Sequence, residues 1–146
     1  MDSKQMLDVL ERILEKSHVA VMLTVDSDGR PRSRWMTPTT VRGRKGFLYT
    51  VSAPHFEKID QLAKNSGVSW LIQTRALDEV LEVVSKGQVI DNPALKSEVL
   101  EAIGGHLTTF WRVNPDEREL IVVETIIEEL TYLQPMKGDK VKATLE

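Results

Sequence analysis

The feature of this sequence that most constrains its fold is a series of short runs rich in β-branched residues, each followed by a turn signal. Residues 19–25 (VAVMLTV) end at DSDG, whose Asp28 and Gly29 suit the positive φ angles of a tight hairpin turn. Residues 30–40 follow, and the segment VRGRKG then leads to residues 47–51 (FLYTV). Because turns this short join antiparallel neighbours, the three runs predict an antiparallel meander.

Later runs of the same kind predict three more strands, at residues 68–74, 79–91 and 119–133. Residues 106–111 (HLTTFW) fit either a strand or a short connector. The tail, residues 137–146 (KGDKVKATLE), is expected to be loosely held.

Three segments carry apolar residues at helical spacing instead. Residues 3–16 predict an amphipathic helix with Ser3 as its N-cap, and residues 52–65 predict a second helix capped by Ser52. The third helix begins after Asn92, which precedes a proline at the first helical position.

Six strands joined mainly by short turns predict a mainly β (α+β) fold, a six-stranded antiparallel split barrel with flanking helices. The chain has 146 residues, of which 41% are hydrophobic, as is usual for a single core. We therefore expect residues 1–146 to form one domain.

Composition excludes several classes of protein. The formal charge of −3 argues against a general nucleic-acid binder, which would need a basic face. No apolar run approaches the roughly 18 residues of a membrane span, and the N-terminus does not resemble a signal peptide, so we expect a cytoplasmic protein. The sequence has no cysteine, and its three histidines lack zinc-type spacing, so no metal site is predicted.

Positive charge is nevertheless concentrated in the second predicted strand, where alternation places Arg30, Arg32 and Arg34 on one face. For Arg30 and Arg32, next to a turn, a solvated strand edge is the favoured interpretation. Arg34 is expected opposite Ala53, where the second helix begins and presents unpaired N–H groups and a positive dipole end. Lys58, one turn into that helix, can reach the same place.

The sequence therefore predicts a phosphate site at this junction, formed by Arg34, Lys58, the helix amides and a hydroxyl of Thr50 or Ser52. The adjacent Trp35 and Met36 fit either the core or a surface that faces a ligand.

Four stretches carry a family resemblance: VAVMLTVDSDGRPRSRWM, the turn after it, GFLYTVSAP and EKIDQLAKNSGVSWLI. In this order and spacing they resemble the pyridoxamine-phosphate-oxidase-related flavin-binding split barrels, especially their short bacterial general-stress-protein branch. The resemblance implies flavin mononucleotide (FMN) bound at the interface of a homodimer.

The resemblance also assigns roles to residues. Arg34 falls on the arginine that grips the flavin phosphate, and Lys58 falls on the lysine of the following helix. The stretch that runs beneath the isoalloxazine ring through backbone contacts falls on Trp35, Met36 and Thr37. The aromatic–threonine pair of the third strand falls on Tyr49 and Thr50.

Other family positions match less cleanly. A serine and an arginine that precede the lysine fall in the segment from Ser52 to His55, where His55 is the candidate substitute. Val80 stands near the place of a flavin-contacting glutamine. Trp111 is a candidate contribution from the partner subunit, although a buried core residue is its more usual interpretation.

The expected activity follows from the C-terminal sequence YLQPMKGDKVKATLE, which lacks the arginine and histidine that hold pyridoxamine phosphate in true oxidases. We therefore expect a flavoprotein that transfers hydride or electrons between a reduced nicotinamide, NAD(P)H, and an unidentified acceptor. The alternative within this fold is a non-catalytic, stress-response protein that binds flavin, haem or deazaflavin, with His55 or His106 as an axial haem ligand. An oligonucleotide-binding barrel is disfavoured because the chain has few aromatic residues.

Overall fold

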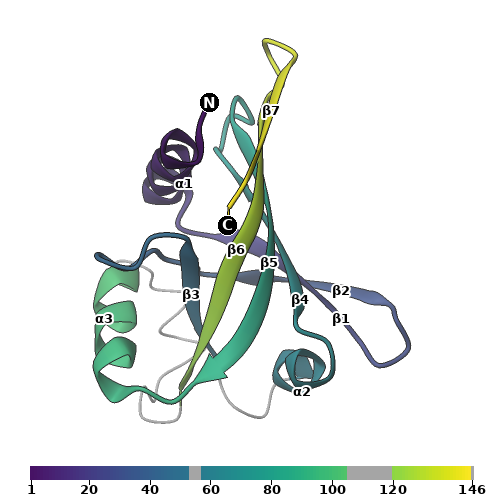
Figure 1. Cartoon of the computed structure of the whole chain (residues 1–146), viewed down its shortest axis with the longest axis vertical. Helices are drawn as coiled ribbons and strands as arrows, with labels where there is room; N and C mark the ends of the chain where they lie inside the picture. Colours follow the sequence, from purple (N-terminus) through teal and green to yellow (C-terminus); the bar gives the residue numbers. More distant parts are fainter. Residues whose placement is uncertain (53–56, 105–119, 146) are drawn as a thin grey trace.

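The computed structural model describes residues 1–52, 57–104 and 120–145, with the backbone alone at residues 57 and 58. This part of the chain contains three helices and seven strands (Figure 1). In chain order they are α1 (Ser3–Ser17), β1 (Ala20–Val25), β2 (Pro31–Met36), β3 (Phe47–Ser52), α2 (Glu57–Lys64), β4 (Gly67–Gln73), β5 (Val80–Ile90), α3 (Pro93–Ile103), β6 (Ile121–Gln134) and β7 (Asp139–Thr144).

All strand pairs are antiparallel, in the order β2-β1-β4-β5-β6-β3, with β7 also paired to β6. This arrangement confirms the predicted mainly β, antiparallel split-barrel class. The count differs, because seven strands rather than six are present in the described residues.

The predicted meander of the first three strands is wrong at its third member. β3 pairs with β6, in a register that runs from Phe47 opposite Ile126 to Ser52 opposite Ile121. Between β2 and β3 the described residues form a single bridge, Thr39 to Tyr49. The sheet is therefore open between β2 and β3, and this opening is the split of the barrel.

The tail is also ordered differently from the prediction. Residues Asp139–Thr144 form β7, which pairs with β6 from Glu129 to Gln134 on the edge that β3 leaves free. Lys142 forms an ion pair with Glu129, with 3.0 Å between Nζ and Oε1. Sequence alternation in KVKAT was therefore a strand signal that the loose-tail interpretation missed.

Two of the predicted helix N-caps, Ser3 and Ser52, are wrong. The N-cap of α1 is Asp2 rather than Ser3, because Asp2 Oδ1 accepts from the backbone N–H of Gln5 at 2.8 Å. Ser52 ends β3 and does not cap α2, whose first described residue is Glu57. Asn92 caps α3 as predicted.

The core lies on both faces of the sheet. The barrel interior packs against α1 and α2 and includes the fully buried Trp70, Met22 and Leu130. A second cluster, beneath α3, includes Tyr49 and Val99. Figure 1 shows α1 and α3 on one side of the long β5–β6 pair and α2 at the lower end, beside β4.

Gly87 lets α2 pack closely on β5. A Cβ atom at this position would lie 2.9 Å from Val68 Cγ2 and 3.0 Å from Leu62 Cδ2, so a larger residue would push Leu62 of α2 away. The missing side chain therefore sets the position of α2 relative to the sheet.

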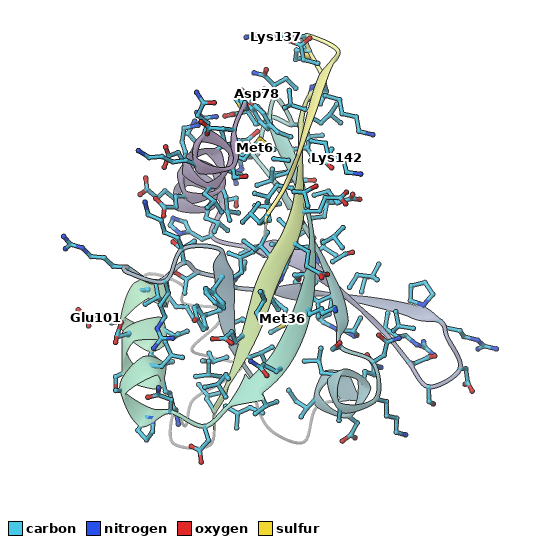
Figure 2. All side chains as sticks on the ribbon, in the orientation of Figure 1. Met6, Met36, Asp78, Glu101, Lys137 and Lys142 are labelled. Atoms are coloured by element: carbon cyan, nitrogen blue, oxygen red, sulfur yellow. The ribbon has the colours of Figure 1, made fainter. Side chains whose placement is uncertain are left out.

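Helix α1 is held at the opposite end of the sheet by the buried carboxylate of Glu79. It accepts hydrogen bonds from Arg12 and from Tyr132 Oη, the latter at 2.5 Å. Burial raises the pKa of Glu79, but the hydrogen bonds from Tyr132 and Arg12 outweigh it and leave the pKa below its ordinary value. Figure 2 shows the neighbouring Asp78 and Lys137 far from α2, so this cluster is separate from the predicted phosphate site.

None of the helices in residues 1–52, 57–104 and 120–145 is long and apolar enough to cross a membrane.

Candidate functional site

Arg34 of β2 contacts the second helix, but the predicted position opposite Ala53 is wrong, because β3 pairs with β6 and Arg34 pairs with Met22 of β1. Its Nη2 donates to Oε1 of Gln61 on α2 at 3.1 Å, and its Nη1 lies 3.5 Å from the carbonyl oxygen of Met22 on β1. The side chain is half-buried. The guanidinium therefore lies between the β1–β2 hairpin and the middle of α2.

Gln61 was not predicted as a site residue, yet it joins three elements. Besides Arg34, its Oε1 accepts a hydrogen bond from the hydroxyl of Thr24 on β1. Gln61 is 8% exposed and Thr24 is fully buried. Since Gln61 follows Lys58 by three positions, helical spacing puts it over the same face of α2, and this was the available sequence signal.

Other predicted cationic and aromatic positions are only partly described. The backbone of Lys58 lies in α2, one turn before Gln61, and its side chain lies outside the described residues. His55 and Trp111 also lie outside the described part of the chain. Arg32, two positions before Arg34, forms an exposed ion pair with Asp26 (3.0 Å, Nε to Oδ2), which agrees with its interpretation as a solvated strand edge.

Strand β3 separates its predicted site residues between two faces. Thr50 and Ser52 are both buried, and Thr50 Oγ1 donates to the carbonyl oxygen of Thr37 at 3.1 Å. Tyr49 points the other way, into the cluster beneath α3. The structure thus brings Thr50 to the segment after β2 but does not bring the Tyr49 side chain to the same face.

Tyr49 instead belongs to a polar row across β3, β6 and β5, in which Tyr49 and Glu124 are buried and Gln88 is exposed. Its hydroxyl donates to Glu124 Oε2 at 2.8 Å, and Gln88 Nε2 donates to Glu124 Oε1 at 2.9 Å. Burial and the hydrogen bond to Glu124 raise the pKa of Tyr49 to about 12. The row fixes the register of β3 against β6.

The stretch after Arg34 presents three different environments. Trp35 is 70% exposed, whereas Met36 packs against the barrel core and lies in the middle of the molecule in Figure 2. The hydroxyl of Thr37 is buried and has no hydrogen-bond partner among the described residues. Thr37 is also one of the residues that line a hollow of about 380 Å³, together with His18 after α1 and Ile103 of α3.

Strand β2 also has a free edge. In the described sheet it pairs only with β1, so one row of its N–H and C=O groups faces the opening of the barrel. Such groups can bind the polar edge of a planar ring. Within the described residues, a half-buried guanidinium, a hydroxyl without a partner and an uncovered strand edge lie along β2 and the segment after it.

Comparison with protein families agrees with this geometry. Residues 6–133 match the family described as pyridoxamine 5'-phosphate oxidase. The chain belongs to the pyridoxamine 5'-phosphate oxidase family. The resemblance seen in the sequence is thereby confirmed, and the matched range contains every predicted site residue.

Solved structures of this family and fold are similar over most of the chain. General stress protein 26 from Bacillus anthracis has a TM-score of 0.72 at 19% identity, covering 97% of this chain and 99% of that one. A pyridoxamine 5'-phosphate oxidase-related, FMN-binding protein from Nostoc punctiforme has a TM-score of 0.68 at 12% identity, covering 95% of each chain.

A haem-binding protein from Mycobacterium smegmatis is also similar, with a TM-score of 0.74 at 13% identity, covering 95% of this chain and 57% of that one. At these identities the likeness shows the fold alone. No curated protein sequence matches the chain significantly.

The Tyr49–Glu124 pair predicts a dependence of stability on alkaline pH. An unfolded tyrosine loses its proton near pH 10, whereas folded Tyr49 keeps it to about pH 12. Between these values the folded state binds more protons, so the free energy of unfolding falls as pH rises. We expect Tyr49→Phe to remove part of this fall, as measured by urea unfolding at a series of pH values.

Tyr132→Phe is the matched control, because it removes a different buried phenol whose pKa is also raised, by burial and by Glu79. That variant should keep the Tyr49 contribution. A difference between wild type and Tyr49→Phe that does not change with pH would contradict the assignment.

Proposed function

We propose that this protein is a flavoprotein that binds FMN with its phosphate at the junction of β2 and α2. The observation that carries the proposal is the Arg34 guanidinium, held between the carbonyl oxygen of Met22 and the side chain of Gln61 in the second turn of α2. A guanidinium can bind a phosphate through paired, charge-assisted hydrogen bonds. Lys58 and the amides of the first turn of α2 add positive charge from the helix side.

The isoalloxazine ring would lie along β2. There, the backbone of Trp35, Met36 and Thr37 offers hydrogen-bonding groups at the edge of β2 that no described strand covers, and the buried Thr37 hydroxyl has no partner among the described residues. Thr50 supports this stretch from β3 through its hydrogen bond to the Thr37 carbonyl oxygen. Ser52 and His55 remain candidates for the phosphate end.

Bound FMN would supply hydride and electron transfer, and we propose a reduced nicotinamide as donor and an unidentified acceptor. The protein's own contribution is to bind and orient the cofactor and to keep its environment partly dry.

The site would be completed by a second copy of the chain. On the outer face of the sheet, Trp35, Val21 and Leu71 stand side by side on β2, β1 and β4. Trp35 is 70% and Leu71 is 42% exposed, so this apolar row is open to solvent in one chain. It adjoins the free edge of β2, where the ring would lie, and this supports a homodimer with the cofactor at the interface and Trp111 as a candidate contribution from the partner.

A haem-binding function is the second candidate, favoured by the fold likeness to the Mycobacterium smegmatis protein. The visible absorption spectrum of the freshly purified protein separates the two, because flavin absorbs as a yellow chromophore and haem shows a Soret band. A deazaflavin phosphate would use the same cationic site as FMN.

Removing the Arg34 side chain tests the phosphate site. We expect Arg34→Ala to raise the Kd for FMN about 10- to 100-fold, the loss of one or two charge-assisted hydrogen bonds. The fold should survive, because the Gln61 oxygen keeps its donor Thr24. Fluorescence titration measures the Kd, and circular dichroism checks the fold.

Arg32→Ala is the matched control. It removes the same charge from the same face of β2, but Arg32 is paired with Asp26 and exposed. The control should change the Kd by less than about twofold. Wild-type affinity in Arg34→Ala, or equal losses in both variants, would contradict the proposal.

The dimer is tested at Leu71. A carboxylate in an apolar interface is costly to desolvate, so Leu71→Glu should convert a dimer to monomers and weaken FMN binding. Leu77→Glu, at a residue that is 50% exposed and lies in the turn before β5, is the control and should stay dimeric. Sedimentation velocity gives the masses. A monomeric wild type, or a fully dimeric Leu71→Glu variant, would overturn the interface.

A further inference from the structure

We infer that Gln61 is a positioning residue that fixes the Arg34 guanidinium for phosphate and thereby sets the preference for a phosphorylated flavin. The inference rests on the proposed function and deepens it. Gln61 would not touch the cofactor itself; its carbonyl oxygen would act through Arg34.

Gln61 contacts two strands through a single side-chain oxygen atom. A single oxygen, Oε1, accepts from Arg34 Nη2 at 3.1 Å and from the Thr24 hydroxyl. Thr24 and Arg34 lie on neighbouring strands, because Met22 on β1 pairs with Arg34 and Thr24 pairs with Arg32. Gln61 thus fixes the end of a flexible side chain against two strands and a helix.

The chemistry explains why a neutral amide suits this place. An arginine side chain loses rotamer entropy when it is fixed, so an anchor already present in the protein reduces the entropy that phosphate binding must offset. A carboxylate would anchor Arg34 more strongly but would neutralise its charge. An amide oxygen holds the guanidinium without adding a negative charge of its own.

A purely structural role is the competing explanation, since the buried Thr24 hydroxyl needs an acceptor. The two explanations differ in what they predict for riboflavin, which has the same ring as FMN but no phosphate. Loss of a structural support would weaken both ligands, whereas loss of the Arg34 anchor would weaken FMN alone.

The test is a set of fluorescence titrations with FMN and riboflavin on wild type, Gln61→Met, Arg34→Ala and the double variant. Methionine keeps the length and helix preference of glutamine but lacks the carbonyl acceptor. We expect Gln61→Met to raise the FMN Kd about tenfold, the effect of one lost hydrogen bond to a charged group, and to leave the riboflavin Kd unchanged. In the Arg34→Ala background the same substitution should have no further effect on FMN.

Gln61→Glu keeps the test valid if the methionine variant does not fold, because it retains an acceptor for both Thr24 and Arg34. Its negative charge should weaken FMN but not riboflavin. Lys64→Met, on the exposed side of α2, is the control for helix substitution and should bind both ligands as wild type does.

The results separate the inference from the proposed function. If Arg34→Ala weakens FMN but both Gln61 variants bind it normally, or if they weaken FMN and riboflavin equally, Gln61 is not a positioning residue. If Arg34→Ala itself leaves the FMN Kd unchanged, the proposed phosphate site is wrong.

Discussion

The contact between the oxygen of Gln61 and its two donors, Arg34 and Thr24, joins the second helix to the first hairpin. Every part of the proposed site depends on it, because α2 brings Lys58 and its N-terminal amides, while β2 brings the guanidinium. Gly87 sets how closely the helix approaches the sheet, since a side chain there would displace Leu62. The position of the Arg34 guanidinium thus depends on the buried side-chain amide of Gln61 and on the absence of a side chain at Gly87.

The opening between β2 and β3 is the second feature on which the proposed site depends. β6 is long enough to pair with β3 along one half of an edge and with β7 along the other, so β3 is drawn away from β2. No strand of the described residues then covers the second edge of β2, next to Thr37. A closed meander would have used the same backbone groups for strand pairing and left no place for a planar ring.

The sequence predicted local structure well and long-range pairing poorly. Alternation and turn residues located the strands, and helical spacing with Asn92 and Asp28-Gly29 located ends and turns. They cannot show which distant strand pairs with β3, because a short loop permits a hairpin but does not require one. The weak apolar content of residues 139–144 likewise hid β7, whose stability comes from pairing with β6.

The residues of the candidate site were likewise predicted only in part. Arg34 was found because charge in a strand is unusual, and its approach to the second helix was predicted from topology, although the expected partner opposite it was wrong. Gln61 was missed because a single glutamine on a helix has no distinctive pattern. Tyr49 matched a family position, yet strand alternation alone places it on the face opposite Thr50.

The most direct test of the account is a crystal structure of the protein with FMN. The account predicts phosphate oxygens about 2.7–2.9 Å from nitrogens of Arg34, with Gln61 still bound to the same guanidinium. A phosphate bound elsewhere, with Arg34 contacting only protein groups, would contradict it.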